Sequence, residues 1–182
     1  RMRFACFDCG ESSVYRVWGA GNSWPRADAL YFVVSEKEGR MDRKDIYSFM
    51  ARHRYGVVSS VSPDGVSQSA LVGIAVTPEL EIIFDTLNST RKYRNLSEHP
   101  RCSFVVGWEG EQTVQYEGVA TEPKGTELER FQETYFAVWP ECVAHLSWPG
   151  IAYFVVTPTW IRYSDYDQGP PLIEELDFEV DR

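Results

Sequence analysis

The segment from Thr86 to Lys92 carries the residues of this chain best suited to binding an anion. Thr86 and Thr90 offer hydroxyl groups, and Thr90 is the expected N-cap of a helix that starts with Arg91 and Lys92. Two cations in a first helical turn are unfavourable by themselves, because the helix N-terminus already carries partial positive charge and free N–H donors. A bound phosphate would reverse that balance. The alternative is a solvated Arg-Lys pair that tolerates the dipole, and the local sequence leaves both interpretations open.

Other reactive side chains form no recognisable pattern. The three histidines, His53, His99 and His145, lie far apart without metal-ligand spacing, so we expect no metal site. His145 falls in a loop with Trp139 and Trp148, which could line a pocket. No Ser-His-acid or Cys-His set is evident, and no catalytic residue is assigned. Such a chain suits a cofactor that brings its own reactivity.

The four cysteines do not predict a disulfide framework in a chain of this length. Cys6 and Cys9 form a single C-x-x-C with no second pair, which favours neither zinc nor redox chemistry there. Cys102 lies in an apolar stretch, where we expect a buried thiol. No signal-peptide pattern and no apolar run of about 18 residues are present, so we expect a cytoplasmic protein without a membrane span.

Composition fits one domain with a sizeable core, since 43% of the 182 residues are hydrophobic. The formal net charge of −9 argues against a nucleic-acid binder. Residues 165–182 hold seven acidic residues and one basic residue, which account for six of the nine net negative charges. We therefore expect a mildly acidic body followed by an acidic C-terminal tail over residues 168–182.

The elements that must position Thr86–Lys92 read as strands in meander order with helices between them. Period-two patterns predict strands over residues 56–62, 67–77, 81–86, 101–108 and 112–122, and a last pair over 151–163 that Pro158 interrupts. Helices are expected from Asp42, from Thr90 to about residue 98, and from a capping box at Thr126–Glu129 to Pro140. This inventory of about six strands predicts a mainly β protein, a small antiparallel barrel with peripheral helices.

Residues 1–40 differ from the rest of the chain, with isolated aromatic residues, a Gly-rich turn cluster and one possible strand at 29–35. We interpret residues 1–40 as an N-terminal extension outside the core fold or as translated upstream sequence, and residues 41–167 as the domain.

The order of motifs resembles the pyridoxamine 5′-phosphate oxidase-like family of FMN-binding split barrels. The motifs that carry the resemblance are Pro63-Asp64-Gly65, Phe84-Asp85-Thr86, Thr90-Arg91-Lys92-x-x-Asn95-Leu96-x-x-x-Pro100-Arg101, Glu117-Gly118 and Pro158-x-x-Ile161-Arg162-Tyr163. The similarity covers about residues 42–167, and its Thr-Arg-Lys segment is the most specific part. It favours the phosphate interpretation of Arg91 and Lys92.

The resemblance implies a six-stranded antiparallel split barrel that forms a homodimer, with two flavin sites at the subunit interface. By position, Arg91 and Lys92 would hold the FMN phosphate and the hydroxyls of Thr86 and Thr90 would assist. The resemblance also places Gln112 or Thr113 near the flavin ring or ribityl chain, with Trp160 and Arg162 completing the pocket. For Thr86, Gln112 and Thr113 the alternative is ordinary strand polarity.

Two departures from the family pattern narrow the expected function. The family's oxidases bring an Arg and a Lys from the second strand, where this chain has Ala70 and Ala75. Their C-terminal Arg-x-His element is also absent, so pyridoxamine phosphate oxidation is not expected. The resemblance implies a flavin-dependent oxidoreductase that transfers hydride or electrons to or from an unidentified small molecule. A non-catalytic flavin-binding or stress-related protein, a reductase using the deazaflavin F420, and a haem binder remain open alternatives.

Overall fold

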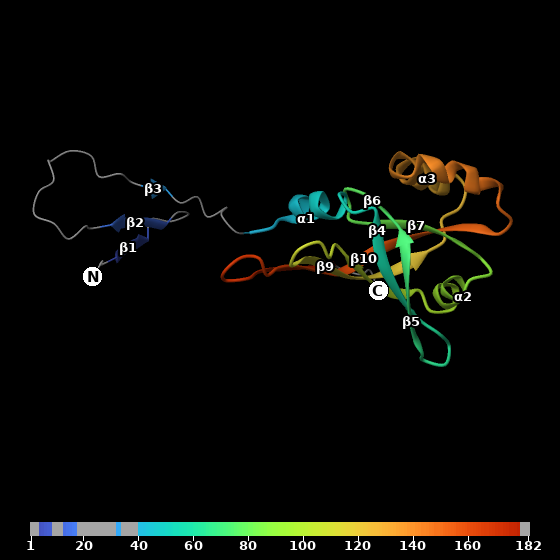
Figure 1. The fold of residues 1–182 in the computed structure, drawn as a ribbon, viewed down its shortest axis with the longest axis horizontal. Helices are drawn as coiled ribbons and strands as arrows, with labels where there is room; N and C mark the ends of the chain where they lie inside the picture. The colour runs from blue at the N-terminus through green and yellow to red at the C-terminus, as the bar shows by residue number, and fades with distance from the viewer. Residues whose placement is uncertain (1–3, 9–12, 18–31, 34–39, 179–182) are drawn as a thin grey trace, which may run out of the picture. The chain divides into compact units, whose positions relative to one another are not determined.

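The structure, a computed structural model, describes residues 4–8, 13–17, 32–33 and 40–178, and it describes side chains in the last of these ranges. The chain forms two compact units, residues 1–40 and 41–182. In the first unit β1 (Phe4–Asp8), β2 (Ser13–Val17) and β3 (Phe32–Val33) form a small antiparallel sheet (Figure 1). The expected strand at 29–35 falls mostly outside the described residues, as does Cys9.

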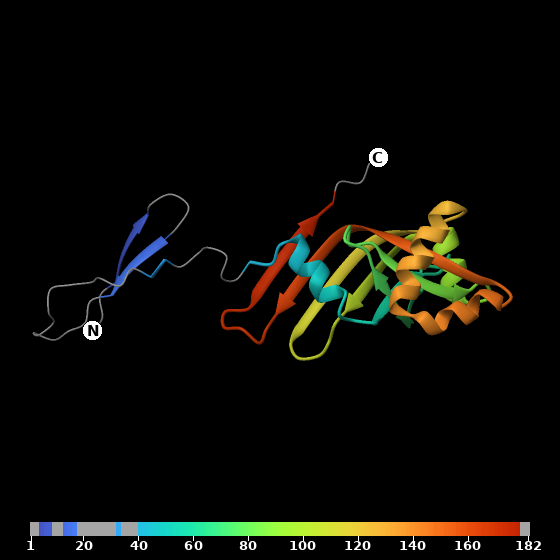
Figure 2. The same ribbon diagram turned by 90° about the horizontal axis from the view of Figure 1, so that it is seen from above.

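The second unit is built on one antiparallel sheet that curls into a half-barrel (Figures 1 and 2). The neighbouring strands in this sheet follow the order β5-β4-β8-β9-β10-β7-β6, and β11 pairs with β10. The strands are β4 (Tyr55–Val61), β5 (Ser67–Gly73), β6 (Ala75–Val76), β7 (Ile82–Leu87), β8 (Arg101–Val106), β9 (Gln112–Thr121), β10 (Ile151–Asp165) and β11 (Leu172–Asp177). The predicted mainly β split barrel is confirmed, with a different number of strands.

The strand count differs because the stretch 67–77 divides at Ile74. The Ile74 N–H donates to the Arg54 carbonyl at 2.9 Å, and its own carbonyl accepts from Trp139 Nε1 at 2.9 Å. These bonds lead the backbone out of one ladder and into another, so β5 pairs with β4 whereas β6 pairs with β7. The extra strand β11 lies in the acidic stretch that the sequence did not predict as a strand.

The last strand, β10, is a single 15-residue strand and not the expected pair. It pairs with β9 along most of its length, with β7 at its start and with β11 at its end. The register shifts between Pro158 and Trp160, which confirms an irregularity at the proline. Gly118 lies opposite Pro158, and a Cβ on Gly118 would approach the Thr157 carbonyl oxygen to 2.5 Å, so the bulge requires glycine there.

The helices are α1 (Arg43–Met50), α2 (Arg91–Glu98), α3 (Thr126–Val138) and the 3-10 helix η1 (Pro140–Ser147). The predicted N-caps are confirmed at Asp42, which forms a capping box with Asp45, and at Thr90. The predicted capping box of α3 is wrong, since Gly125 is its N-cap and no side chain caps it. Gly125 has φ 57°, which allows the helix to begin at Thr126 itself. No helix in the described part of the chain is long and apolar enough to cross a membrane.

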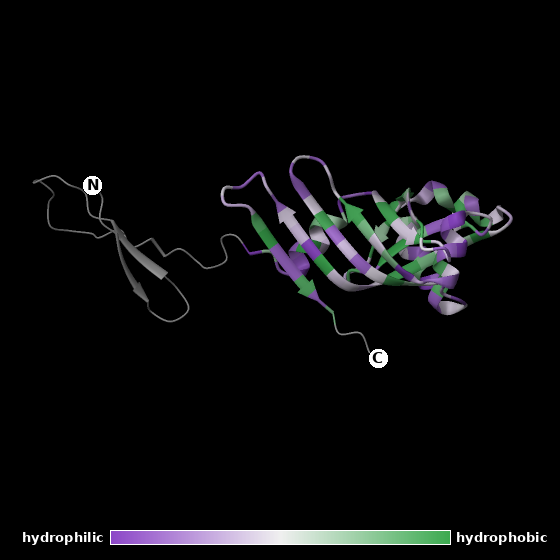
Figure 3. Cartoon of the chain, turned by 90° about the horizontal axis from the view of Figure 1, so that it is seen from below, coloured by the Kyte–Doolittle hydropathy of each residue, from purple (hydrophilic) through white to green (hydrophobic). Residues whose placement is uncertain are grey.

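The core consists of two clusters on opposite faces of β7 and β10, because side chains alternate along a strand. The larger cluster fills the half-barrel and includes Phe84 and Phe154, whereas the smaller one lies under α3 and η1 and includes Ile83 and Tyr153. Figure 3 shows polar and apolar residues alternating along several strands of the sheet, whereas β7 and β10 are buried on both faces over much of their length. Successive side chains of β7 therefore pack alternately into the larger and the smaller cluster.

Candidate functional site

The turn between β7 and α2 is fixed by hydrogen bonds of its own residues. The Thr86 and Thr90 hydroxyl oxygens are 3.0 Å apart and hydrogen-bonded. Thr90 Oγ1 also donates to the Leu87 carbonyl at 2.8 Å and accepts from the Tyr93 N–H at 3.3 Å, which caps α2. The Asn88 N–H donates to the Gly150 carbonyl at 2.7 Å, so the turn is tied to the start of β10. These contacts set where Arg91 and Lys92 begin the helix.

The first turn of α2 has cations but no carboxylate, whereas the first turn of α1 has both. Both helices begin with Arg-Lys, as Arg43-Lys44 in α1 and as Arg91-Lys92 in α2. In α1 the Asp42 carboxylate accepts from the N–H groups of residues 44 and 45, and a second acid, Asp45, lies in the first turn. In α2 the cap is a neutral hydroxyl and the first turn has no acidic residue. The start of α2 therefore has positive charge that no acidic residue of its own cap or first turn compensates, and an external anion would neutralise it.

A cavity of about 370 Å³ opens at this helix start. It is lined by Val58, Ser60, Gln68, Ser69, Ala70, Thr90, Arg91 and Lys92. Its only ionisable lining side chains are cations, and hydroxyl and amide groups supply further donors. Its volume lies within the usual range for small-molecule sites of about 300–1,000 Å³. The cavity is thus suited to an anionic ligand.

Residues of β4 and β5 hold α2 against this cavity. Asn95 is 4% exposed, and its Nδ2 donates to Ser60 Oγ at 3.0 Å and to Gln68 Oε1 at 3.1 Å. Sequence reasoning missed Ser60 and Gln68; the signal was their place on the inward-facing positions of paired strands. Ala70 lines the cavity, whereas Ala75 is buried in the cluster under α3.

The remaining residues of the expected site lie elsewhere in the single chain. Gln112 donates to Asp165 Oδ2 at 3.2 Å and lines a second cavity of about 470 Å³, together with Phe49, Arg52, His53, Arg54, Tyr55, Trp108 and Glu109. Thr113 of β9 lies opposite Ser164 of β10 in the strand ladder. Trp160 of β10 lies opposite Glu117 of β9 on one side and Asp177 of β11 on the other. Arg162 forms an ion pair with Glu175 at 3.4 Å. The structure therefore brings together Thr86, Thr90, Arg91 and Lys92 but not Gln112, Thr113 and Trp160.

The second cavity contains a histidine with a perturbed pKa. Burial and the neighbouring Arg52 lower the pKa of His53, while Glu109 acts in the opposite direction. The imidazole ring packs against Phe49 with centroids 4.7 Å apart. The lowered pKa favours a neutral imidazole beside Gln112 at neutral pH.

Comparison with known proteins agrees with this architecture. The family model described as pyridoxamine 5′-phosphate oxidase matches residues 43–165. No curated protein sequence matches the chain significantly.

Several solved structures have the same fold. A haem-binding protein from Mycobacterium smegmatis is 16% identical with a TM-score of 0.65, and the alignment covers 76% of this chain but 59% of that protein. General stress protein 26 from Bacillus anthracis is 18% identical with a TM-score of 0.59, covering 75% of this chain and 98% of that one. A pyridoxamine 5′-phosphate oxidase-related, FMN-binding protein from Nostoc punctiforme is 11% identical with a TM-score of 0.53, covering 74% and 91%. At these identities the likeness concerns the fold.

Proposed function

Because this chain belongs to the pyridoxamine 5′-phosphate oxidase family, we propose that it binds FMN and acts as a flavin-dependent oxidoreductase on a small molecule. The observation that carries the proposal is the start of α2, where Arg91 and Lys92 face a cavity without any acidic lining residue. A phosphate monoester is the ligand that best matches two cations, capping hydroxyls and free backbone N–H groups.

The chain's own contribution is binding and orientation of the cofactor. Arg91 and Lys92 would neutralise the phosphate, and the paired hydroxyls of Thr86 and Thr90 hold the turn that presents them. Ser60, Ser69 and Gln68 offer neutral donors and acceptors further along the cavity. When bound, FMN would supply hydride and electron transfer. With Ala70 in the cavity wall, the helix start would carry most of the anion binding.

We propose a homodimer in which the partner subunit completes the flavin site. Gln112 and its cavity lie apart from Arg91 within one chain, which is expected when the two ends of a ligand contact different subunits. Leu71 is 61% exposed and Val105 40% exposed. Both lie opposite Val57 on the outward face of β5, β4 and β8. An apolar strip of this kind is typical of an interface between subunits.

The visible absorption spectrum of the isolated full-length protein tests the proposal directly. We expect flavin bands, and mass spectrometry of the released ligand should identify FMN. Addition of NADH or NADPH under anaerobic conditions should bleach these bands if the protein is an oxidoreductase. A protein that is colourless and takes up neither FMN nor a deazaflavin would contradict the proposal.

The same experiment separates the remaining candidates. A flavin-binding protein without turnover would keep FMN but show no reduction of the flavin. This alternative is favoured by the lining of the α2 cavity, in which Arg91 and Lys92 are the only ionisable side chains. A deazaflavin-dependent reductase would release a ligand of different mass. A haem protein would show a porphyrin spectrum in place of flavin bands.

A further inference from the structure

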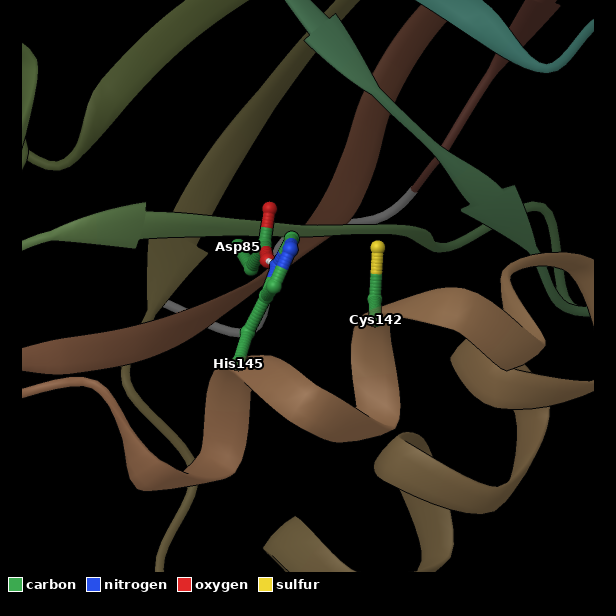
Figure 4. A group of neighbouring side chains, drawn as sticks. All are labelled: Asp85, Cys142 and His145. Carbon is green, nitrogen blue, oxygen red and sulfur yellow. Dashed lines mark hydrogen bonds and ion pairs between the residues drawn. The ribbon is translucent and has the colours of Figure 1, made fainter.

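Three side chains with metal-binding atoms meet on the face of β7 opposite the α2 cavity. Asp85 of β7 lies beside Cys142 and His145 of η1, and the candidate ligand atoms all lie within 4.8 Å of one another (Figure 4). Asp85 immediately precedes Thr86 in sequence, but strand alternation directs it toward α3 and η1. None of the three residues lines the α2 cavity.

The carboxylate of Asp85 is held by two neighbours. The Tyr135 hydroxyl donates to Asp85 Oδ1 at 3.1 Å, and Asp85 Oδ2 lies 3.1 Å from His145 Nδ1. The imidazole is also stacked on Trp148, with ring centroids 3.9 Å apart. Tyr135 and Trp148 lie outside the proposed ligand set, and orientation of ligands by such outer contacts is typical of metal sites.

A fourth group in the same place lacks a partner. Tyr153 lies directly across from Asp85 in the β7–β10 ladder and is 3% exposed. Its hydroxyl is buried without a hydrogen-bond partner. A buried hydroxyl without a partner is costly, and a metal-bound water or anion would satisfy it.

We propose that Asp85, Cys142 and His145 form a binding site for a divalent transition metal of the zinc class. One sulfur, one nitrogen and one oxygen ligand suit tetrahedral Zn²⁺ with its fourth position open to water or another ligand. Tetrahedral ligand atoms stand about 3.5 Å apart, so the widest separation here would close by about 1 Å on binding. The site lies near the surface, since the Asp85 and His145 side chains are 18% and 26% exposed.

The Asp85 carboxylate brings negative charge to this group of side chains, which suits a bound cation. A divalent ion would compensate the Asp85 carboxylate and stabilise the Cys142 thiolate. The bound ion would link η1 to strand β7.

Titration of Co²⁺ into the full-length protein tests this site, because a cobalt–thiolate bond gives a charge-transfer band that carboxylate and imidazole ligands do not. The experiment uses a Cys6→Ser, Cys9→Ser background so that the N-terminal C-x-x-C cannot contribute. Difference spectra remove any absorption by bound flavin. We expect one equivalent of Co²⁺ to saturate the band, and Zn²⁺ to displace it.

Substitutions assign the ligands. Cys142→Ala should abolish the band, whereas Cys102→Ala, at the other buried cysteine of the described residues, should retain it. Asp85→Asn and His145→Gln should each weaken Co²⁺ binding at least about 100-fold, the upper end of the loss seen for outer-shell changes. A band that persists in Cys142→Ala, or no saturable binding in the parent, would overturn the proposal.

A second measurement covers the case in which Cys142→Ala does not fold. Zn²⁺ should raise the Tm of the parent but not that of His145→Gln, whose side chain is partly exposed and tolerant of change. Equal Tm shifts in both proteins would mean that the ion binds elsewhere. Retained cofactor content in His145→Gln would show that the variant is folded, since the metal site and the α2 cavity share no residue.

Discussion

Arg91 and Lys92 are the residues on which the proposed cofactor binding depends. They are the first two residues of α2, which, unlike α1, has no carboxylate in its cap or first turn. The hydroxyl cap supplied by Thr90 satisfies one N–H group but adds no negative charge. A dianionic phosphate would therefore be bound mainly by charge-assisted hydrogen bonds.

Replacement of these cations should weaken FMN binding. Each charge-assisted hydrogen bond is worth about 1.5–3 kcal/mol, so Arg91→Ala and Lys92→Ala should each raise the Kd for FMN roughly 10- to 100-fold. Lys44→Ala is the matched control, because Lys44 is also the second residue of a helix that starts with Arg-Lys. Fluorescence titration with FMN measures the Kd of each variant and of the control. Equal Kd values for Lys92→Ala and Lys44→Ala would argue against the site.

His53 should make stability depend on pH. Burial and Arg52 lower its pKa in the folded protein below the ordinary 6.5. As pH falls below 6.5, the unfolded chain binds a proton before the folded protein does, so the free energy of unfolding should decrease until pH passes the folded pKa. His53→Gln should flatten this part of the profile, measured by urea unfolding at a series of pH values. His99→Gln, in the exposed turn after α2, is the control, and an unchanged slope in His53→Gln would refute the assignment.

At the scale of elements, α2 is positioned by its buried face. Leu96 packs in the half-barrel core and Asn95 bonds to β4 and β5, so the helix start is held rigidly beside the cavity. The chain entering α2 is anchored in addition by Gly150, which has φ 78° and lies against the Asn88 side chain. A larger residue at position 150 would be strained at this φ, and its Cβ would collide with the Asn88 side chain, which would have to move.

Loss of the Asn95 side chain should affect stability and binding together. Asn95→Ala leaves the buried Ser60 hydroxyl and Gln68 without their shared donor, which we expect to cost about 1–3 kcal/mol of unfolding free energy. It should also raise the Kd for FMN, because α2 would be less firmly held. Ser97→Ala, an exposed change on the same helix, should stay within about 0.5 kcal/mol of the parent. Chemical denaturation measures the expected loss of unfolding free energy. An Asn95→Ala protein with unchanged unfolding free energy and unchanged Kd for FMN would contradict this role.

At the scale of the whole molecule, the strip formed by Leu71, Val57 and Val105 is the face proposed to meet a second subunit. The strip crosses three neighbouring strands on their outward side. A flavin site divided between subunits would couple assembly to cofactor retention, since neither subunit alone would contain all the contacts.

A charge in this strip should therefore dissociate the dimer and release the cofactor. Leu71→Asp would bury an unpaired carboxylate at the interface, and light scattering after size exclusion should detect a shift from dimer to monomer with loss of bound FMN. Val143→Asp is the control, since Val143 is an apolar side chain on η1 that is 48% exposed. A parent protein that is monomeric yet retains FMN would reject the shared site.

Most local features of this protein followed from the sequence alone, although the capping box predicted for α3 did not form. Period-two runs predicted most strands, and short-range capping rules located Asp42 and Thr90, because such signals depend on residues only a few positions apart. The segment Thr86–Lys92 was predicted as one unit for the same reason, and the structure brings its members together.

Features that depend on distant contacts were decided only by the tertiary structure. The pairing of β10 with three strands, the division at Ile74 and the separation of Gln112 from Arg91 arise from contacts between residues many positions apart. The three histidines carried no ligand spacing in the sequence, yet packing of η1 on β7 places His145 beside Asp85, 60 residues away. Sequence spacing determines which face of an element a side chain occupies, whereas packing of the elements determines what that face meets.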